Sequence, residues 1–278
     1  MTAQPSPVFQ IDASNPRRLS RAMEDLSSGM QTWRLSWALA RLDLRNRYRG
    51  SVIGPFWLTL STAAMLAGLG LLYSRLLGIS LRDYLPHLAV SLVVWNVING
   101  LVTDACTALT GAEGVIRQMR LPFTTHALRC VFRNVLTAAH NIPLLFLVLA
   151  IFNRWPGPEV VLLVPGLLIF FLNALAASVF LGMVCARFRD VGPIVTNIMQ
   201  LAFFMSPVIW KADLLSPAAR AWLPLNPFYD LLEVLRGPLV DGGGAMMAWV
   251  GAILYTLAAT GLALGFFVRF RGRLAFWV

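Results

Sequence analysis

The amino-acid sequence predicts an all-α membrane protein with six transmembrane helices. Composition is the first observation: 58% of the 278 residues are hydrophobic and only 13% are charged. That is more apolar side chain than a soluble domain of this size can bury. The second observation is the distribution of the charges, which leaves six uncharged apolar windows. The third is the absence of alternating segments of about ten residues, which are typical of outer-membrane barrels.

The six windows account for most of the chain between residues 50 and 268. A helix needs about 20 apolar residues to cross the hydrocarbon of a bilayer, and each window reaches that length. The windows are residues 50–74, 84–103, 134–153, 160–186, 191–210 and 242–268. We expect each to form one span of a six-span transmembrane domain covering residues 50–268.

Two segments of different character precede the first window. Residues 1–29 are polar and lack the apolar core of a signal peptide, so a polar N-terminal tail is expected. Residues 30–49 alternate large apolar residues with arginines. At helical spacing Trp33, Trp37 and Leu44 share one face, and Arg34, Arg41 and Arg45 share another. This pattern predicts an amphipathic helix in the membrane interface, either as a plain anchor or as a gate for anionic lipid.

The connection between the second and third windows contains a short amphipathic stretch. It begins at Glu113 and is stopped by Pro122. Val115 and Ile116 supply apolar side chains between the charged ones, and a solvated loop would not need them. The stretch therefore predicts a cytoplasmic docking helix for a partner protein, with a plain loop as the alternative.

The connection between the last two windows, residues 211–241, is too long for a turn and is rich in aromatic residues and proline. Asn226 and Pro227 are typical of a helix cap and first turn, so we expect one short helix in this loop. The aromatic side chains indicate either an interfacial belt or a re-entrant lid over a pore exit. They are Trp210, Trp222, Phe228 and Tyr229.

The basic residues indicate the orientation. Seventeen of the 23 lie in segments on the side of the N-terminus and six lie on the other side, so the positive-inside rule predicts that both termini are cytoplasmic. The net charge of +10 therefore reports topology, and we expect no nucleic-acid partner. Residues 269–278 form the cytoplasmic C-terminal tail in this scheme.

The sequence offers little for catalysis. Lys211 is the only lysine and no glycine run precedes it, so the chain lacks a Walker loop for ATP. No Cys or His pair has the spacing of metal ligands. Asp230 and Glu233, three residues apart, are the one acid pair that a membrane transferase could use. Asp104 and His140 lie in or beside the apolar windows, where an ionisable group is a functional candidate by default.

Six sequence motifs resemble those of ABC-2 type permeases. They occur in order and cover almost the whole chain after about Trp33. The motifs are RYRGSVIGPFW from Arg47, VIRQMRLP from Val115, ARFRDV from Ala186, SPVIW from Ser206, LNPF from Leu225 and RGRLAFWV from Arg271. They are most similar to the transmembrane subunit of bacterial polysaccharide exporters of the O-antigen and capsule type.

This resemblance implies a multi-pass protein of the bacterial inner membrane that forms a homodimer above two copies of a separate ATP-binding subunit. ATP and Mg²⁺ then bind to the partner, and this chain binds no cofactor. The cargo implied is a polysaccharide linked to a polyprenyl pyrophosphate lipid. Within the family, small-molecule or drug export is the alternative.

The resemblance also assigns three groups of residues. Coupling to the ATPase is implied for Glu113, Val115, Ile116, Arg117 and Arg120. Access of the lipid pyrophosphate is implied for Arg41, Arg45, Arg47 and Arg49, because arginine binds phosphate in a bidentate manner. The polysaccharide path is implied for Phe56, Trp57, Tyr73, Phe203 and Phe204. The candidates for the exit loop remain the aromatic residues that the composition of residues 211–241 and its border indicated, Trp210, Trp222, Phe228 and Tyr229.

Overall fold

The computed structural model describes residues 17–54 and 56–278, and these residues form helices and no strands. Pro55, in the first motif, lies outside the described residues. The α-helices are α1 Arg18–Gln31, α2 Trp33–Arg47, α3 Phe56–Leu76, α4 Leu81–Cys106, α5 Glu113–Gln118, α6 Phe123–Ala139, α7 Ile142–Ile151, α8 Leu163–Arg187, α9 Val191–Met205, α10 Pro217–Arg220, α11 Pro227–Val240, α12 Met246–Phe270 and α13 Leu274–Trp277. Short 3₁₀ turns are η1 Thr110–Ala112, η2 Pro158–Leu162, η3 Ala212–Leu214, η4 Leu223–Leu225 and η5 Arg271–Arg273.

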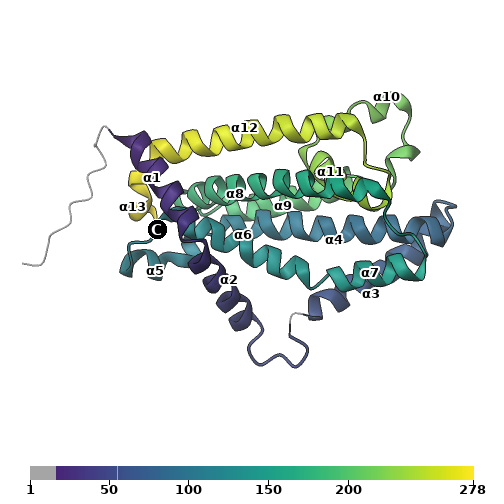
Figure 1. Cartoon of the computed structure of the whole chain (residues 1–278), viewed down its shortest axis with the longest axis horizontal. Helices are drawn as coiled ribbons and strands as arrows, with labels where there is room; N and C mark the ends of the chain where they lie inside the picture. Colours follow the sequence, from purple (N-terminus) through teal and green to yellow (C-terminus); the bar gives the residue numbers. More distant parts are fainter. Residues whose placement is uncertain (1–16, 55) are drawn as a thin grey trace, which may run out of the picture.

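The long helices run side by side along one axis (Figure 1). The helices α1, α5 and α13 gather at one end, which we call the terminal end. The start of α4 and the short α10 lie at the opposite, distal end. The two described ends of the chain thus lie together at one end of the bundle.

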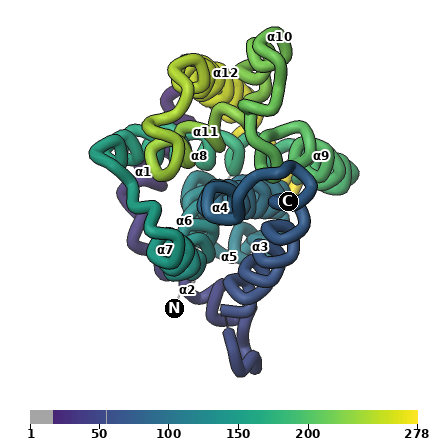
Figure 2. Tube along the Cα trace, turned by 90° about the vertical axis from the view of Figure 1, so that its right-hand side faces the viewer, coloured from purple at the N-terminus to yellow at the C-terminus, as the bar shows by residue number. Residues whose placement is uncertain are grey.

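Helix α4 is the centre of the bundle (Figure 2), and α3, α6, α8, α9 and α11 all pack against it. Its apolar side chains point in every direction, as a helix buried on all sides requires. Leu88, Leu92 and Ile98 are almost fully buried in the main hydrophobic core. Helix α3 lies at the edge and leaves most of its apolar side chains exposed.

The all-helical fold with membrane-spanning helices is confirmed. Among the described residues, five helical runs are long and apolar enough to cross a membrane, and the fifth predicted window corresponds to a shorter apolar helix, α9. The five long runs are Phe56–Leu76, Leu81–Cys106, Phe123–Ile151, Pro158–Arg187 and Met246–Trp277.

The third span begins earlier than the window 134–153. Helix α6 starts at Phe123 and includes Arg129 and Arg133, whose charges are paired with aspartates of other helices. The run is then interrupted between α6 and α7, where Pro143 lies in the first turn of α7. The His140 ring lies 2.7 Å from the Leu136 carbonyl oxygen, so this side chain satisfies a backbone group at the end of α6.

Helix α1 occupies part of the segment expected as a polar tail; residues 1–16 lie outside the described residues. Its Asp25 is 2% exposed and caps α6, because its carboxylate accepts hydrogen bonds from the backbone N–H groups of Phe123 and Thr124. Arg271 donates to the same carboxylate over 2.8 Å. This one side chain therefore joins α1, the start of α6 and the segment that follows α12.

The predicted amphipathic helix is present as α2 and packs along α6. Leu44 is buried, and Trp37 meets the Phe132 ring edge-on at 5.5 Å. Trp33, expected on the same face, is exposed. Helix α11 begins at the predicted cap, where the Asn226 side chain accepts hydrogen bonds from two backbone N–H groups of the first turn.

Candidate functional site

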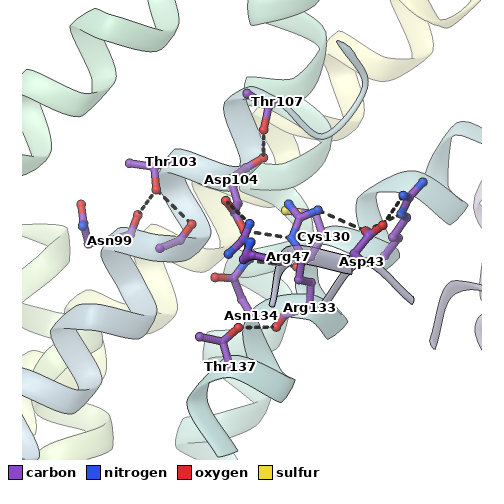
Figure 3. Close-up of polar contacts among 12 residues, drawn as sticks. Asp43, Arg47, Asn99, Thr103, Asp104, Thr107, Cys130, Arg133, Asn134 and Thr137 are labelled. Carbon is purple, nitrogen blue, oxygen red and sulfur yellow. Dashed lines mark hydrogen bonds and ion pairs between the residues drawn. The ribbon is translucent and has the colours of Figure 1, made fainter. Parts of the chain in front are cut away.

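A polar cavity of about 420 Å³ opens between α3, α4 and α6 toward the terminal end. Ten of the fifteen residues that line it are polar or charged, although apolar atoms supply the larger part of its surface. Figure 3 shows how several of these side chains converge from three helices. The polar lining includes Arg47, Asn96, Asn99, Thr103, Asp104 and Asn134.

Asp104, near the end of α4, is the centre of this lining. Its Oδ2 accepts hydrogen bonds from Arg133 Nε at 3.0 Å and from Asn134 Nδ2 at 3.1 Å. Its Oδ1 lies 3.7 Å from Arg47 Nη2. The Arg133 contact has hydrogen-bond geometry, whereas the Arg47 contact is a longer ion pair. Breaking the Arg47–Asp104 ion pair therefore costs less free energy than breaking the Arg133–Asp104 hydrogen bond. Arg47 is thus the arginine that can most easily leave Asp104 and bind an incoming anion.

Asp43 of α2 forms the second half of the same ionic network (Figure 3). Arg129 donates to both of its carboxylate oxygens, with Nε at 2.7 Å from Oδ2. Arg133 also reaches Asp43, with Nη1 at 3.2 Å from Oδ2. Arg133 thus bridges two aspartates, and the network fixes α2 and α4 against α6. Three arginines face two aspartates, so the network as a whole carries a net positive charge beside the cavity.

An unpartnered amide lies deeper in the cavity wall. Asn141, at the break between α6 and α7, has a buried Oδ1 with no hydrogen-bond partner among the described residues. A buried polar atom is normally paired, so this oxygen is available to a hydroxyl group or water in the cavity. Asn96 donates to Thr62 over 3.3 Å on the facing wall. The cavity can bind a polar headgroup through its lining and an anion at its mouth.

The structure brings one of the four predicted phosphate-binding arginines into this cavity. Arg47 lines it, whereas Arg41, Arg45 and Arg49 are exposed along α2 and just beyond it. None of these three forms an ion pair within the described chain. Asp43, Arg129 and Arg133 were missed by sequence reasoning, because all three lie outside the apolar windows and nothing in the sequence showed their pairing.

Helix α5 is shorter than the predicted stretch, and none of its residues is buried. Glu113 and Arg117 pair on its surface at 2.7 Å. Arg117 Nη2 also donates to the main-chain carbonyl oxygen of Val278 at 3.0 Å. Ile116 packs against a hydrophobic cluster that contains Leu274. Val115 and Arg120 lie on the accessible part of the same segment. Helix α5 therefore packs against the C-terminal segment. The sequence did not indicate this contact.

The predicted aromatic residues form two groups. Phe56 and Trp57 are exposed in the first turn of α3, and Phe56 meets the His140 ring at 5.7 Å. Tyr73, in the last turn of α3, packs against the main core. Phe203 and Phe204 lie in the last turn of α9, and Phe203 packs against the same core as Tyr73. Phe56 and Trp57 lie at the opposite end of α3 from Tyr73.

The second group surrounds Trp95 of α4, which sequence reasoning missed. The Phe203 ring lies 5.6 Å from Trp95 and the Phe228 ring 6.0 Å from it. Trp210 Nε1 donates to the Phe204 carbonyl oxygen at 3.2 Å, so the loop is tied to the end of α9. Tyr229 is buried, and Trp222 is exposed at the loop surface.

The candidate acid pair of a transferase is inaccessible. Asp230 is 1% exposed and Glu233 is 6% exposed within α11. Glu233 forms an ion pair with the buried Arg236. A sugar donor would have no access to either carboxylate, so the geometry disfavours transferase chemistry here.

Known proteins are similar to this chain in sequence. The family model described as ABC-2 type transporter matches residues 34–240. A protein named O-antigen export system permease protein RfbA from Myxococcus xanthus is 26% identical over 201 residues, which is 70% of this chain and 76% of that protein. A protein of the same name from Klebsiella pneumoniae is 20% identical over 205 residues, covering 72% of this chain and 78% of that protein.

Proposed function

Because the chain belongs to the ABC-2 type transporter family, we propose that it is the permease subunit of an ATP-driven exporter of polysaccharide linked to polyprenyl pyrophosphate. Two relatives named as O-antigen export permeases support the class of cargo. The observation that carries the proposal is the polar cavity with Arg47 at its mouth. It combines a cation for a phosphate with amides and hydroxyls for a sugar.

In this proposal the lipid pyrophosphate approaches along α2. The exposed guanidinium groups of Arg41, Arg45 and Arg49 attract the anion at the cytoplasmic surface of the inner membrane. Arg47 then binds it in place of Asp104. Asp104 stays neutralised by Arg133 after this exchange, so the exchange leaves no buried carboxylate unpaired.

The proposed assembly is a homodimer with two copies of a separate ABC ATP-binding subunit, and both termini are cytoplasmic. The partner subunits hold ATP and Mg²⁺. Helix α5 supports this proposal because it is accessible on the terminal end and carries both charged and apolar side chains. The exposed apolar faces of α3 and α9 are available to lipid or to a second copy. Aromatic side chains at the ends of these helices would hold an uncharged polymer without selecting its sequence.

The test is reconstitution of the full chain with its ATPase in vesicles loaded with the lipid-linked polysaccharide. We expect movement of the polymer only with ATP. Binding of the lipid-linked glycan with no ATP-dependent movement would refute the export proposal. Deletion of the gene distinguishes polysaccharide export from drug export. Loss of surface polysaccharide in the deletion strain supports the proposal. Increased drug sensitivity with normal surface polysaccharide contradicts it.

A further inference from the structure

A second cavity, of about 430 Å³, lies at the distal end of the bundle, opposite the cavity that contains Arg47. Its wall is assembled from four separate parts of the chain: the start of α4, the segment after α7, the loop after α9 and the end of α11 (Figure 1). The residues that matter for its chemistry are Asp83, Arg154, Trp155, Glu159, Lys211 and Asp241.

Most charges in this wall neutralise one another. Arg154 forms an ion pair with Asp83, and Lys211 Nζ donates to the Asp83 carbonyl oxygen at 3.2 Å. Asp241 Oδ2 lies 3.1 Å from Arg236 Nε. The cavity therefore has no surplus of cations for a phosphate group. No group of three acidic, His or Cys side chains in the described part of the chain has the geometry of a metal site.

Two groups in the wall are left without partners. Trp155 is 58% exposed, and its indole N–H makes no hydrogen bond within the described chain. The exposed Glu159 carboxylate forms neither an ion pair nor a hydrogen bond there. A flat apolar ring and a free hydrogen-bond acceptor thus border the same cavity, and its volume lies in the range of small-ligand sites.

These features select the class of ligand. The wall carries the carboxylates of Asp83, Glu159 and Asp241 against the cations of Arg154 and Lys211. This surplus of negative charge repels an anionic ligand, whereas an uncharged ligand meets no such repulsion. The Trp155 ring provides an apolar face with a polar N–H edge, and the Glu159 carboxylate accepts hydrogen bonds from hydroxyl groups. Sugar rings offer C–H faces and hydroxyl edges in that combination.

We infer that the distal cavity is a saccharide-binding site in which Trp155 stacks on a neutral sugar ring and Glu159 accepts a hydroxyl hydrogen bond. The inference rests on the proposed function, because the exported glycan is the source of the sugar. The glycan would reach this cavity at the distal end of the bundle, after its lipid has entered at the terminal end. It adds a site that is separate from the aromatic residues proposed for the path.

The test measures saccharide binding to the full-length chain in lipid nanodiscs, without the ATPase. The probe is the surface polysaccharide of the source organism, cleaved from its lipid and cut to short oligosaccharides, and the readout is saturation-transfer NMR. We expect Trp155→Ala to lower the signal at least fivefold and Glu159→Gln to lower it about twofold or more. Trp33→Ala, another exposed tryptophan, and Asp213→Asn, another exposed carboxylate of the distal end, serve as matched controls.

Unchanged binding in both Trp155→Ala and Glu159→Gln would overturn the inference, as would loss of binding in Phe203→Ala together with full binding in Trp155→Ala. Equal melting midpoints of the variants exclude misfolding as the cause of a loss. The outcome is distinguishable from failure of the proposed function, because the latter appears as absence of ATP-dependent transport while saccharide binding at Trp155 persists.

Discussion

The carboxylate of Asp104 links three helices through three partners, Arg47 in α2 and Arg133 and Asn134 in α6. The sequence singles out Asp104 as a polar residue beside a span. It could not predict the partners, because Arg47 and Arg133 are distant along the chain and basic residues look the same whether they are paired or solvated. The structure separates Arg133, held by two carboxylates, from Arg47, held by one long contact.

The first prediction concerns the energy of the Asp104–Arg133 pair. Asp104→Asn removes the charge that Arg133 faces in a half-buried site, and Arg133→Gln removes the partner of Asp104. In a double-mutant cycle we expect a coupling of about 1–2 kcal/mol. Thermal unfolding in detergent measures it, because each kcal/mol shifts the midpoint by about 2–4 °C in a chain of this size. Additive effects of the two substitutions would contradict an energetic link between these residues.

The second prediction tests Arg47 as the phosphate-binding cation. Arg47→Ala should raise the concentration of lipid-linked substrate that half-saturates the substrate-stimulated ATPase by at least tenfold. Arg47→Lys should recover only part of the loss, because an ammonium group cannot bind a phosphate in a bidentate manner. Arg34→Gln, on the same helix but beside Trp33, is the control and should behave as wild type. A change in maximal rate alone would argue for a structural role of Arg47.

At the scale of the elements, the sequence predicted those helix ends that depend only on neighbouring residues. The Asn226-Pro227 pair predicted the start of α11, and Glu113 and Pro122 bracketed α5. The start of α6 was mispredicted because a charge-free window stops at Arg133, whereas Asp43 and Asp104 neutralise the arginines inside the helix. Helix α1 was missed because what stabilises it, the contact of Asp25 with the start of α6, joins residues far apart in the sequence.

The third prediction concerns helix α5 as the contact with the ATPase. Glu113→Arg and Arg117→Glu should each uncouple ATP hydrolysis from transport while the protein still folds, because an exposed ion pair of this spacing contributes only about 0.3–0.5 kcal/mol. The exchanged double variant Glu113→Arg, Arg117→Glu restores the pair within the helix. It should stay uncoupled if the charges face a partner. Wild-type coupling in the double variant would show that the pair acts only within α5.

The fourth prediction concerns the packing of α1 on α6. A Cβ atom added at Gly29 would lie 2.6 Å from the Thr124 Cβ, closer than two such atoms can approach. Gly29→Ala should therefore push α1 away from α6 and lower the melting midpoint by several degrees. The loosened helix should then be cleaved faster by trypsin at Arg18 and Arg21, whose side chains are already exposed. Gly68→Ala in α3, where an added Cβ meets nothing within 4 Å, is the control. Equal protease resistance of the two variants would show that α1 does not pack tightly on α6.

At the scale of the whole molecule, the sequence predicted the apolar helices, since they follow from the cost of placing charge in hydrocarbon. The division of the basic residues between the two sides of the membrane stays a prediction. It could not predict that α4 would be the central helix, because all six windows are similarly apolar. Burial of α4 follows from how the other helices surround it. The faces of α3 and α9 that the rest of the chain leaves uncovered are apolar.

The fifth prediction tests the orientation of the whole bundle, which rests on 17 basic residues on one side against six on the other. Ser20 in α1 and Ala218 in α10 are exposed at opposite ends of the molecule. In intact spheroplasts, a membrane-impermeant maleimide should label Ala218→Cys at once and Ser20→Cys only after the membrane is opened. The background should be low, because Cys106, Cys130 and Cys185 are all buried. Labelling of Ser20→Cys from outside would reverse the topology. It would then place α5 beyond the reach of a cytoplasmic ATPase, and the coupling proposal would fail together with the orientation.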